Sequence, residues 1–218
     1  MARALVAHAL DLHVVGLEHV PARGACVLVA RHYHHLYDAA AILATIQRDV
    51  HILVALDWLG GGMRLRLMRW LIVAARWPAV WRSRHGSGIN RDGYRLSLSL
   101  LREGRLLLVF PEGYPTIDPQ GSRKRDRNAW LPFDPGFLTL AERAGVPVCI
   151  VPVGMSYAER PGGGWTVWLR IGGAVHLGAR APGERRVRLE SIEARVRQLS
   201  LPTTTMCDSR AAITEPPR

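Results

Sequence analysis

The sequence predicts an α/β fold, a single domain with a mixed, largely parallel sheet and helices on both faces. Three observations lead to this prediction. Short apolar runs typical of strands alternate with longer segments typical of helices, an order that produces crossover connections between parallel strands. No internal repeat or clear linker divides the 218 residues. At 48% hydrophobic residues, the chain is long enough to bury one substantial core.

Six short runs have the composition of strands. The run at 106–110 contains only apolar residues, as expected for a strand that is buried on both faces. The first and last runs alternate apolar and polar residues, which indicates one solvated face. Strands are expected at residues 12–17, 26–30, 51–56, 106–110, 148–153 and 165–171.

Five longer segments predict helices. The first is rich in Ala, Ile and Leu and carries Asp38 near its N-terminus, where a negative charge suits the helix dipole. The second lies between a glycine triplet and a Trp-Pro breaker, and the last is laced with Arg and Glu. Residues 1–201 are expected to form the domain, and residues 202–218 a disordered tail. Helices are expected at residues 38–46, 63–75, 92–102, 136–144 and 184–199.

Cysteine usage and hydropathy indicate a cytoplasmic protein. The three cysteines, Cys26, Cys149 and Cys207, are an odd number lying far apart in the chain, which predicts reduced thiols. The apolar stretch at the start is too short and too interrupted for a signal peptide. A membrane-spanning helix needs roughly 20 apolar residues, and every run here is broken well before that length. Membrane contact is therefore expected to be peripheral, on the inner face.

The chain is strongly basic. Lys and Arg number 29 against 18 Asp and Glu, a net charge of +11. Such a surface attracts the phosphates of nucleic acid, anionic lipid or an acidic small molecule. Lys124 is the only lysine, and a high-GC codon bias explains the preference for arginine.

Three histidines and a carboxylate follow the predicted strand at 26–30 within one short turn. They are His32, His34, His35 and Asp38. An imidazole held by a carboxylate can take a proton from a hydroxyl, because the carboxylate fixes the tautomer and stabilises the imidazolium. The same cluster could instead cap a helix or bind a metal ion.

A Phe-Pro-Glu-Gly turn at 110–113 leaves the buried strand at 106–110. Its glycine lets a ligand approach the backbone, and its carboxylate can accept hydrogen bonds from hydroxyls. A long polar stretch follows as far as Trp130, and in a compact domain such a stretch is more often functional than idle.

Taken together, these blocks resemble the glycerolipid acyltransferase superfamily of the acylglycerol-phosphate acyltransferase type. The family has a His-to-Asp block, an Arg-bearing block, a Phe-Pro-Glu-Gly block and a Val-Pro-Val strand, in that order. The resemblance covers residues 12–157. The corresponding blocks lie here at residues 32–38, 89–93, 110–113 and 150–153.

The resemblance implies an O-acyltransferase that moves a fatty acyl group from acyl-CoA or acyl-carrier protein to a glycerol-phosphate or lysophospholipid-like acceptor. It implies direct transfer, with His32 as general base and Asp38 as its orienting partner. It also implies that Arg91, Glu112 and Gly113 bind the acceptor. No metal and no organic cofactor are implied.

The chain departs from the family pattern at two places. Five residues separate His32 from Asp38, where the family has four, so His34 is kept as the alternative base. The family's Thr-Arg-Ser after the glycine is replaced by Tyr-Pro-Thr at 114–116, which removes a contact to the acceptor phosphate. Residues 123–125 could supply that charge, although a solvated loop is the interpretation we favour.

Three other interpretations remain at this point. A serine hydrolase is suggested by Ser156 in an incomplete Gly-x-Ser-x-Gly pattern, and a metal-dependent hydrolase by the histidines. A basic membrane- or nucleic-acid-binding protein without enzymatic activity is suggested by the charge, but no nucleic-acid module is recognisable and no nucleic acid is expected as a partner.

The segment 63–82 is predicted to dock on an anionic membrane surface. It combines leucines and tryptophans, among them Trp70 and Trp77, with arginines. A helical wheel places Leu67, Met68, Leu71 and Ile72 on one side and Arg66, Arg69 and Arg76 on another. A core helix with a basic solvent face is the alternative.

Overall fold

The computed structural model describes Val6 and residues 8–57, 62–82, 88–119, 121–176 and 184–202. Cys207 and nearly all of the expected tail at 202–218 lie outside these residues.

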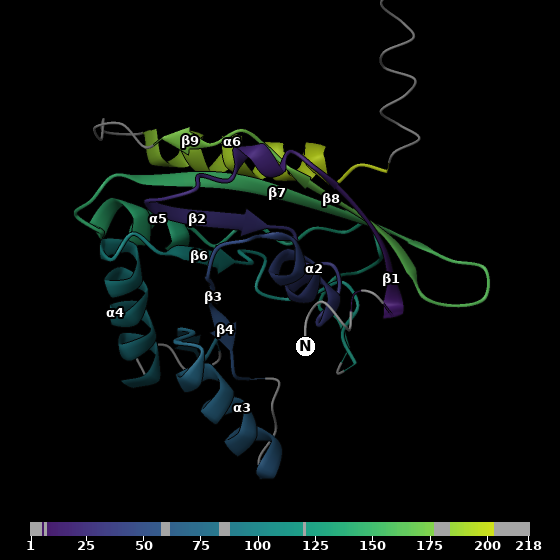
Figure 1. Ribbon diagram of the computed structural model, residues 1–218, viewed down its shortest axis with the longest axis horizontal. Helices are drawn as coiled ribbons and strands as arrows, with labels where there is room; N and C mark the ends of the chain where they lie inside the picture. The colour runs from purple at the N-terminus through teal and green to yellow at the C-terminus, as the bar shows by residue number, and fades with distance from the viewer. Residues whose placement is uncertain are drawn as a thin grey trace, which may run out of the picture.

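A mixed sheet forms the centre of the molecule (Figure 1). Its strand order is β1-β8-β7-β2-β6-β3, and β9 pairs with β7. The β7–β8 and β7–β9 pairs are antiparallel and all other pairs are parallel. The strands are β1 (Leu10–Val15), β2 (Ala25–Ala30), β3 (Val50–Ile52), β6 (Leu106–Val109), β7 (Val148–Glu159), β8 (Trp165–Ile171) and β9 (Val175–His176).

Helices cover both faces of this sheet. Cys26 and Leu28 of β2 pack with α2, whereas Val27 and Val29 pack with α4, α5 and α6, because successive side chains of a strand point to opposite faces. Every residue of β2 is buried, so this strand is the centre of the core. The prediction of a single, largely parallel α/β domain is confirmed. The covering helices are α2 (Tyr37–Thr45), α4 (Gly88–Arg102), α5 (Gly136–Arg143) and α6 (Glu184–Leu199).

The single strand predicted at 51–56 is wrong, because the chain changes sheets within it. Leu53 still donates its amide to Leu108 of β6, but Val54 donates to the carbonyl of Pro78. The result is a second, two-stranded parallel sheet of β4 (Val54–Ala55) and β5 (Ala79–Val80). The helix α3 (Met63–Ala74) connects these two strands and lies away from the main sheet (Figure 1).

The helix α4 begins earlier than predicted, so Asn90 and Arg91 lie in its first turns and not in a preceding loop. The Asn90 side chain accepts a hydrogen bond from the amide of Trp81 at 2.6 Å and donates one to its carbonyl at 2.9 Å. Three residues further on, a Cβ at Gly93 would lie 2.1 Å from the carbonyl oxygen of Ala79. The absence of a side chain there allows α4 to cross β5 in direct contact.

The strand β7 continues six residues beyond its predicted end, from Val153 to Glu159, and pairs there with β8. Ser156 therefore lies inside a strand and is buried, and its hydroxyl accepts a hydrogen bond from Arg170 at 3.1 Å. A serine nucleophile requires an exposed strand-to-helix turn, so this geometry contradicts the serine hydrolase interpretation.

Candidate active site

The site forms where β2 and β6 end at the same edge of the sheet. These neighbouring strands run parallel, so the turn after Ala30 and the turn after Val109 emerge side by side. Ligands of open α/β sheets bind at this edge, beyond the carboxyl ends of the strands. The topology thus brings together two polar blocks that are about 80 residues apart in the chain.

His32 and Asp38 form a hydrogen-bonded pair at this edge. The imidazole Nδ1 lies 2.9 Å from Oδ2 of Asp38, and the His32 ring stacks on Phe110 with 4.3 Å between ring centroids. The Asp38 side chain is fully buried, whereas 16% of the His32 side chain is exposed, toward a cavity. No second hydrogen bond engages the His32 ring among the described residues, so Nε2 is left for a ligand in that cavity.

Further hydrogen bonds fix the Asp38 carboxylate. Oδ2 accepts the amides of Tyr33 at 2.6 Å and His34 at 2.9 Å, and Oδ1 accepts the Tyr157 hydroxyl at 2.6 Å. Burial raises the pKa of Tyr157 well above its ordinary value, and Asp38 raises it further, so Tyr157 remains a donor. The turn wraps around the carboxylate, which is how the additional residue between His32 and Asp38 is accommodated.

The His34 ring does not face Asp38. Its Nδ1 accepts the amides of Leu36 at 3.3 Å and Tyr37 at 3.4 Å, so the ring caps α2 at its N-terminus. Burial, together with a smaller effect of the neighbouring His35, lowers the pKa of His34 to about 4. The ring is therefore neutral near pH 7, and its lone pair is occupied by the helix.

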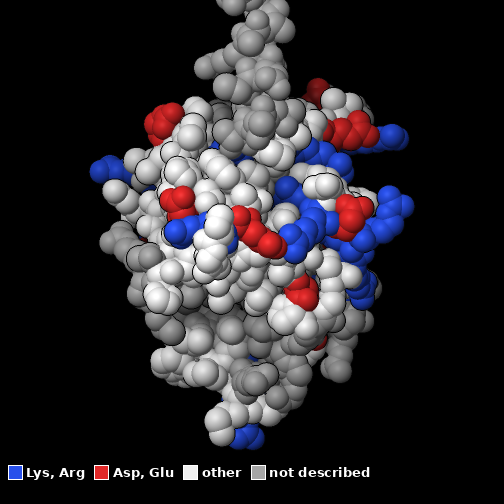
Figure 2. All heavy atoms as spheres, turned by 90° about the vertical axis from the view of Figure 1, so that its right-hand side faces the viewer, with Lys and Arg blue, Asp and Glu red and all other residues white. Residues whose placement is uncertain are grey.

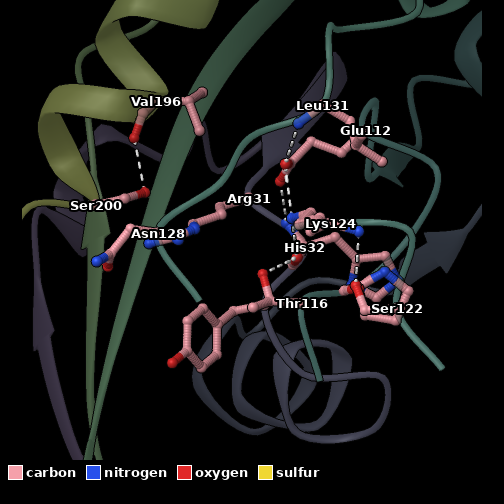
Figure 3. A network of polar contacts seen from close by, with 12 residues as sticks. Arg31, His32, Glu112, Thr116, Ser122, Lys124, Asn128, Leu131, Val196 and Ser200 are labelled. Carbon is pink, nitrogen blue, oxygen red and sulfur yellow. Dashed lines mark hydrogen bonds and ion pairs between the residues drawn. The ribbon is translucent and has the colours of Figure 1, made fainter. Parts of the chain in front are cut away.

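Glu112 and Lys124 form a buried ion pair behind His32 (Figure 3). Lys124 Nζ lies 2.6 Å from Oε2 of Glu112, and neither side chain is exposed. The Glu112 carboxylate also accepts the amides of His32 at 3.0 Å and Leu131 at 3.2 Å. Lys124 is thus not part of a solvated loop, contrary to our interpretation of residues 123–125, and the Glu112 carboxylate is held by three partners inside the protein.

A cavity of about 870 Å³ opens in front of His32. Gly113, in a left-handed conformation with φ of 72°, forms part of its wall and accepts a hydrogen bond from Arg82 through its carbonyl. The guanidinium groups of Arg82 and Arg123 lie 3.9 and 4.2 Å from the ring centroid of Tyr114. The apolar wall includes Leu53, Val80, Phe110, Phe133, Phe137 and Leu140.

Arg91 is not brought to this cavity. It is exposed on α4, and the described residues that line the cavity include its neighbour Asn90 but not Arg91. Among the described residues, the arginines that line the cavity are Arg82 and Arg123. Arg82 was not predicted as a site residue, and Arg123 belongs to the stretch 123–125 that could supply charge but that we interpreted as a solvated loop. Within the described ranges, no three His, Cys, Asp or Glu side chains are grouped so that they could hold a metal ion.

Comparison with known families identifies the chain. The family model described as Acyltransferase matches residues 11–156, which is most of the sequence. The chain belongs to the acyltransferase family. This acyltransferase is therefore an enzyme, and the matched region contains His32, Asp38, Glu112 and Gly113. A comparison with curated protein sequences gives no significant match.

The fold of this acyltransferase is similar to that of a solved relative. The crystal structure of the 1-acyl-sn-glycerophosphate acyltransferase PlsC from Thermotoga maritima superimposes with a TM-score of 0.58 and 20% sequence identity. The alignment covers 86% of this chain and 70% of PlsC. Among the described residues of the acyltransferase, no helix is both long enough and apolar enough to cross a bilayer.

Proposed function

We propose that this acyltransferase moves a fatty acyl group from a thioester donor, acyl-CoA or acyl-carrier protein, to a hydroxyl of a glycerol-phosphate or lysophospholipid-like acceptor. The observation that carries this proposal is the His32–Asp38 pair at the wall of the largely apolar cavity. The likeness of the fold to a 1-acyl-sn-glycerophosphate acyltransferase agrees with it.

In the proposed reaction, the acceptor hydroxyl donates a hydrogen bond to Nε2 of His32. The oxygen attacks the thioester carbonyl while Nε2 takes the proton, and Asp38 stabilises the imidazolium through Nδ1. The tetrahedral intermediate then expels the thiolate as the C–S bond breaks, and the imidazolium returns its proton to sulfur. An ester and a free thiol result, with no covalent enzyme intermediate.

The cavity wall supports an acceptor with an anionic head and a hydrocarbon tail. Arg82 and Arg123 present guanidinium groups beside Tyr114, and guanidinium groups suit two-point contacts with phosphate. Arg82 already pairs with Asp57 at 2.8 Å, so Arg123 is the more available cation of the two. The apolar side chains behind them match an acyl chain.

The direct test of this function is release of free thiol during incubation with acyl-CoA and, separately, acyl-carrier protein. The acceptor panel contains 1-acylglycerol-3-phosphate, glycerol-3-phosphate, lysophosphatidylcholine and monoacylglycerol. We expect turnover that depends on the acceptor and the corresponding esterified product. Thiol release that does not depend on any acceptor would indicate a thioester hydrolase and contradict the proposal.

We also propose that α3 docks the enzyme on the anionic inner surface of a membrane. Met63, Leu67, Trp70 and Leu71 lie along one face of this helix and are exposed, Leu67 by 59% and Trp70 by 66%. Arg66 and Arg69 are exposed beside that face. In Figure 2 most charged side chains lie over the middle and upper part of the molecule, and a basic side chain lies at its lower tip.

The structure changes which residues of 63–82 belong to this docking face. Ile72 is buried against Leu56, and Met68 packs on the same small cluster, so neither shares a free face with Leu67. Trp77 donates its indole N–H to the carbonyl of Val50 at 3.1 Å. Arg76 forms two hydrogen bonds with Glu103, at 2.8 and 2.9 Å, and is therefore not counted as a lipid contact.

A further inference from the structure

Lys124 is exceptional in this chain. It is the only lysine among 29 basic residues, and its ammonium group is completely buried, whereas basic side chains normally remain at the surface. A codon bias toward arginine explains the other basic residues but not this one. The compact ammonium group of lysine occupies this buried position, where arginine would bring a larger planar group.

The ammonium group connects two polar groups that belong to different strand ends. Nζ donates a hydrogen bond to the carbonyl of His32 at 2.7 Å and pairs with Glu112 Oε2 at 2.6 Å. Glu112 Oε1 accepts the amide of His32 at 3.0 Å. Both backbone polar groups of His32 are therefore held by one ion pair, with Lys124 on the carbonyl and Glu112 on the amide (Figure 3).

Each charge of the ion pair is compensated by the other. Burial lowers the pKa of Lys124, and the attraction of Glu112 opposes this shift. Glu112 Oε2 receives an additional amide from Leu131, and the His32 carbonyl receives one from Thr116 at 3.2 Å. Fully partnered buried polar networks hold their members in one arrangement.

We propose that Lys124 is a positioning residue for His32, acting through the Lys124–Glu112 ion pair that fixes the His32 backbone. The proposal rests on the proposed function, in which His32 is the general base. From this backbone position the imidazole reaches both Asp38 and the cavity, and Lys124 is not among the described residues that line the cavity. Loss of Lys124 therefore acts on the chemical step and leaves substrate binding largely intact.

Four variants separate positioning from folding. Lys124→Met removes the ammonium group, and Glu112→Gln removes the opposite charge. The double variant Lys124→Met/Glu112→Gln removes both charges and leaves no unpaired buried charge, so it keeps the proposal testable if a single variant fails to fold. Ser122→Ala is the matched control, because its hydroxyl bonds Pro115 and the Lys124 amide in the same loop without touching His32.

For the double variant, we expect kcat to fall by about 10²-fold, the loss typical of a catalytic group displaced by about 1 Å, while the acceptor KM changes by less than about threefold. Ser122→Ala should keep kcat within about twofold, with unfolding temperatures measured for all variants. Histidine side-chain ¹H–¹⁵N NMR should show the His32 ring losing its fixed Nδ1–H tautomer in the double variant and retaining it in Ser122→Ala.

Two results would overturn the proposal. One is a folded double variant with wild-type kcat. The other is an unchanged His32 tautomer signal, which would count against positioning even if the rate fell. Failure of the proposed function can be distinguished from failure of this proposal. In that case the wild type would not acylate any acceptor, while the NMR comparison would still show whether Lys124 and Glu112 fix the His32 ring.

Discussion

Oδ2 of Asp38 lies 2.9 Å from Nδ1 of His32 and forms a hydrogen bond with it. The same oxygen accepts hydrogen bonds from two backbone amides of the turn between His32 and Asp38. The turn is therefore built around the carboxylate. The number of residues between base and partner matters less than the path of the backbone, since the amides of Tyr33 and His34 both converge on Oδ2.

His32→Ala should remain folded and lose most acyl transfer. The imidazole is partly exposed at the cavity, and its only hydrogen-bond partner among the described residues is Asp38. Without the imidazole, the Asp38 carboxylate still accepts hydrogen bonds from three other donors, so the fold should tolerate the change. A positioned general base contributes about 10²–10⁴ in rate, and kcat should fall by that factor. A decrease within twofold would exclude His32 as the base. Asp38→Asn, assayed beside it, should also lower kcat because the tautomer is no longer fixed.

His34 should influence stability in acid more than catalysis. Its pKa is about 4 in the folded protein against an ordinary value of 6.5, so below pH 6.5 the unfolded chain takes up a proton that the folded chain does not. The contribution of neutral His34 to the free energy of unfolding is therefore fully present above pH 6.5. It decreases as the pH falls toward 4, by up to about 3 kcal/mol.

The variant His34→Asn tests this relationship, because Asn can cap α2 but does not titrate. Urea unfolding at about pH 7 and pH 5 should show a smaller loss of stability in acid for the variant than for the wild type, with kcat at pH 7 within about threefold. An equal loss in both proteins would show that His34 does not cause the acid sensitivity. A loss of kcat as large as that of His32→Ala would assign the base to His34.

The sequence predicted those strands and helices whose residue pattern lies within the element itself. The buried run at 106–110 and the alternating run at 165–171 gave β6 and β8 to within one residue, because their apolar patterns lie within the strands themselves. The two-residue strands β4 and β5 carry no periodic signal, and they exist because Pro78 brings the chain back to Val54. Such pairing is visible only in three dimensions.

The same distinction applies to the candidate site. His32, Asp38, Glu112 and Gly113 stand in recognisable blocks, so the sequence brought them forward as candidates. Tyr157 bonds Asp38 across 119 positions, and Lys124 bonds His32 across 92. Nothing local marks either contact. The one available signal for Lys124 was that it is the only lysine in the chain.

Arg123→Ala should weaken the use of phosphate-bearing acceptors. Its guanidinium lies at the cavity beside Tyr114, and loss of a hydrogen bond to a charged group corresponds to about a tenfold rise in KM. The KM for 1-acylglycerol-3-phosphate should rise and the KM for monoacylglycerol should not. Arg125→Ala is the matched control, because the Arg125 side chain is 94% exposed.

Arg91→Ala, measured in the same assay, tests which arginine contacts the acceptor phosphate. The family resemblance assigns this contact to Arg91, and the cavity lining assigns it to Arg123. Arg91 does not line the cavity among the described residues, so a selective rise in KM at Arg123 alone supports the phosphate contact proposed here. A rise at Arg91 with none at Arg123 would move that contact to α4.

The docking face of α3 predicts that binding to anionic vesicles depends on both apolar and basic residues. An apolar helix face inserts into the interface, and each basic residue near an anionic surface contributes about 1 kcal/mol. The variants are Leu67→Glu/Trp70→Glu, which removes the apolar contact, and Arg66→Gln/Arg69→Gln, which removes the charge. Val187→Glu on α6 is the matched control, because Val187 is exposed to a similar extent, 65%, but lies on another helix.

Flotation with phosphatidylcholine vesicles, with and without phosphatidylglycerol, measures the two contributions separately. The wild type and Val187→Glu should float with the anionic vesicles, and binding should weaken as salt is raised because salt screens the attraction between arginine and lipid. The arginine variant should lose about tenfold in affinity for anionic vesicles, and the Leu67→Glu/Trp70→Glu variant should lose binding to both kinds. Flotation of all four proteins to the same extent and without salt dependence would show that α3 is not the docking face. Because none of these substitutions lies at the cavity, thiol release with acceptors dispersed in detergent should stay unchanged, which separates docking from catalysis.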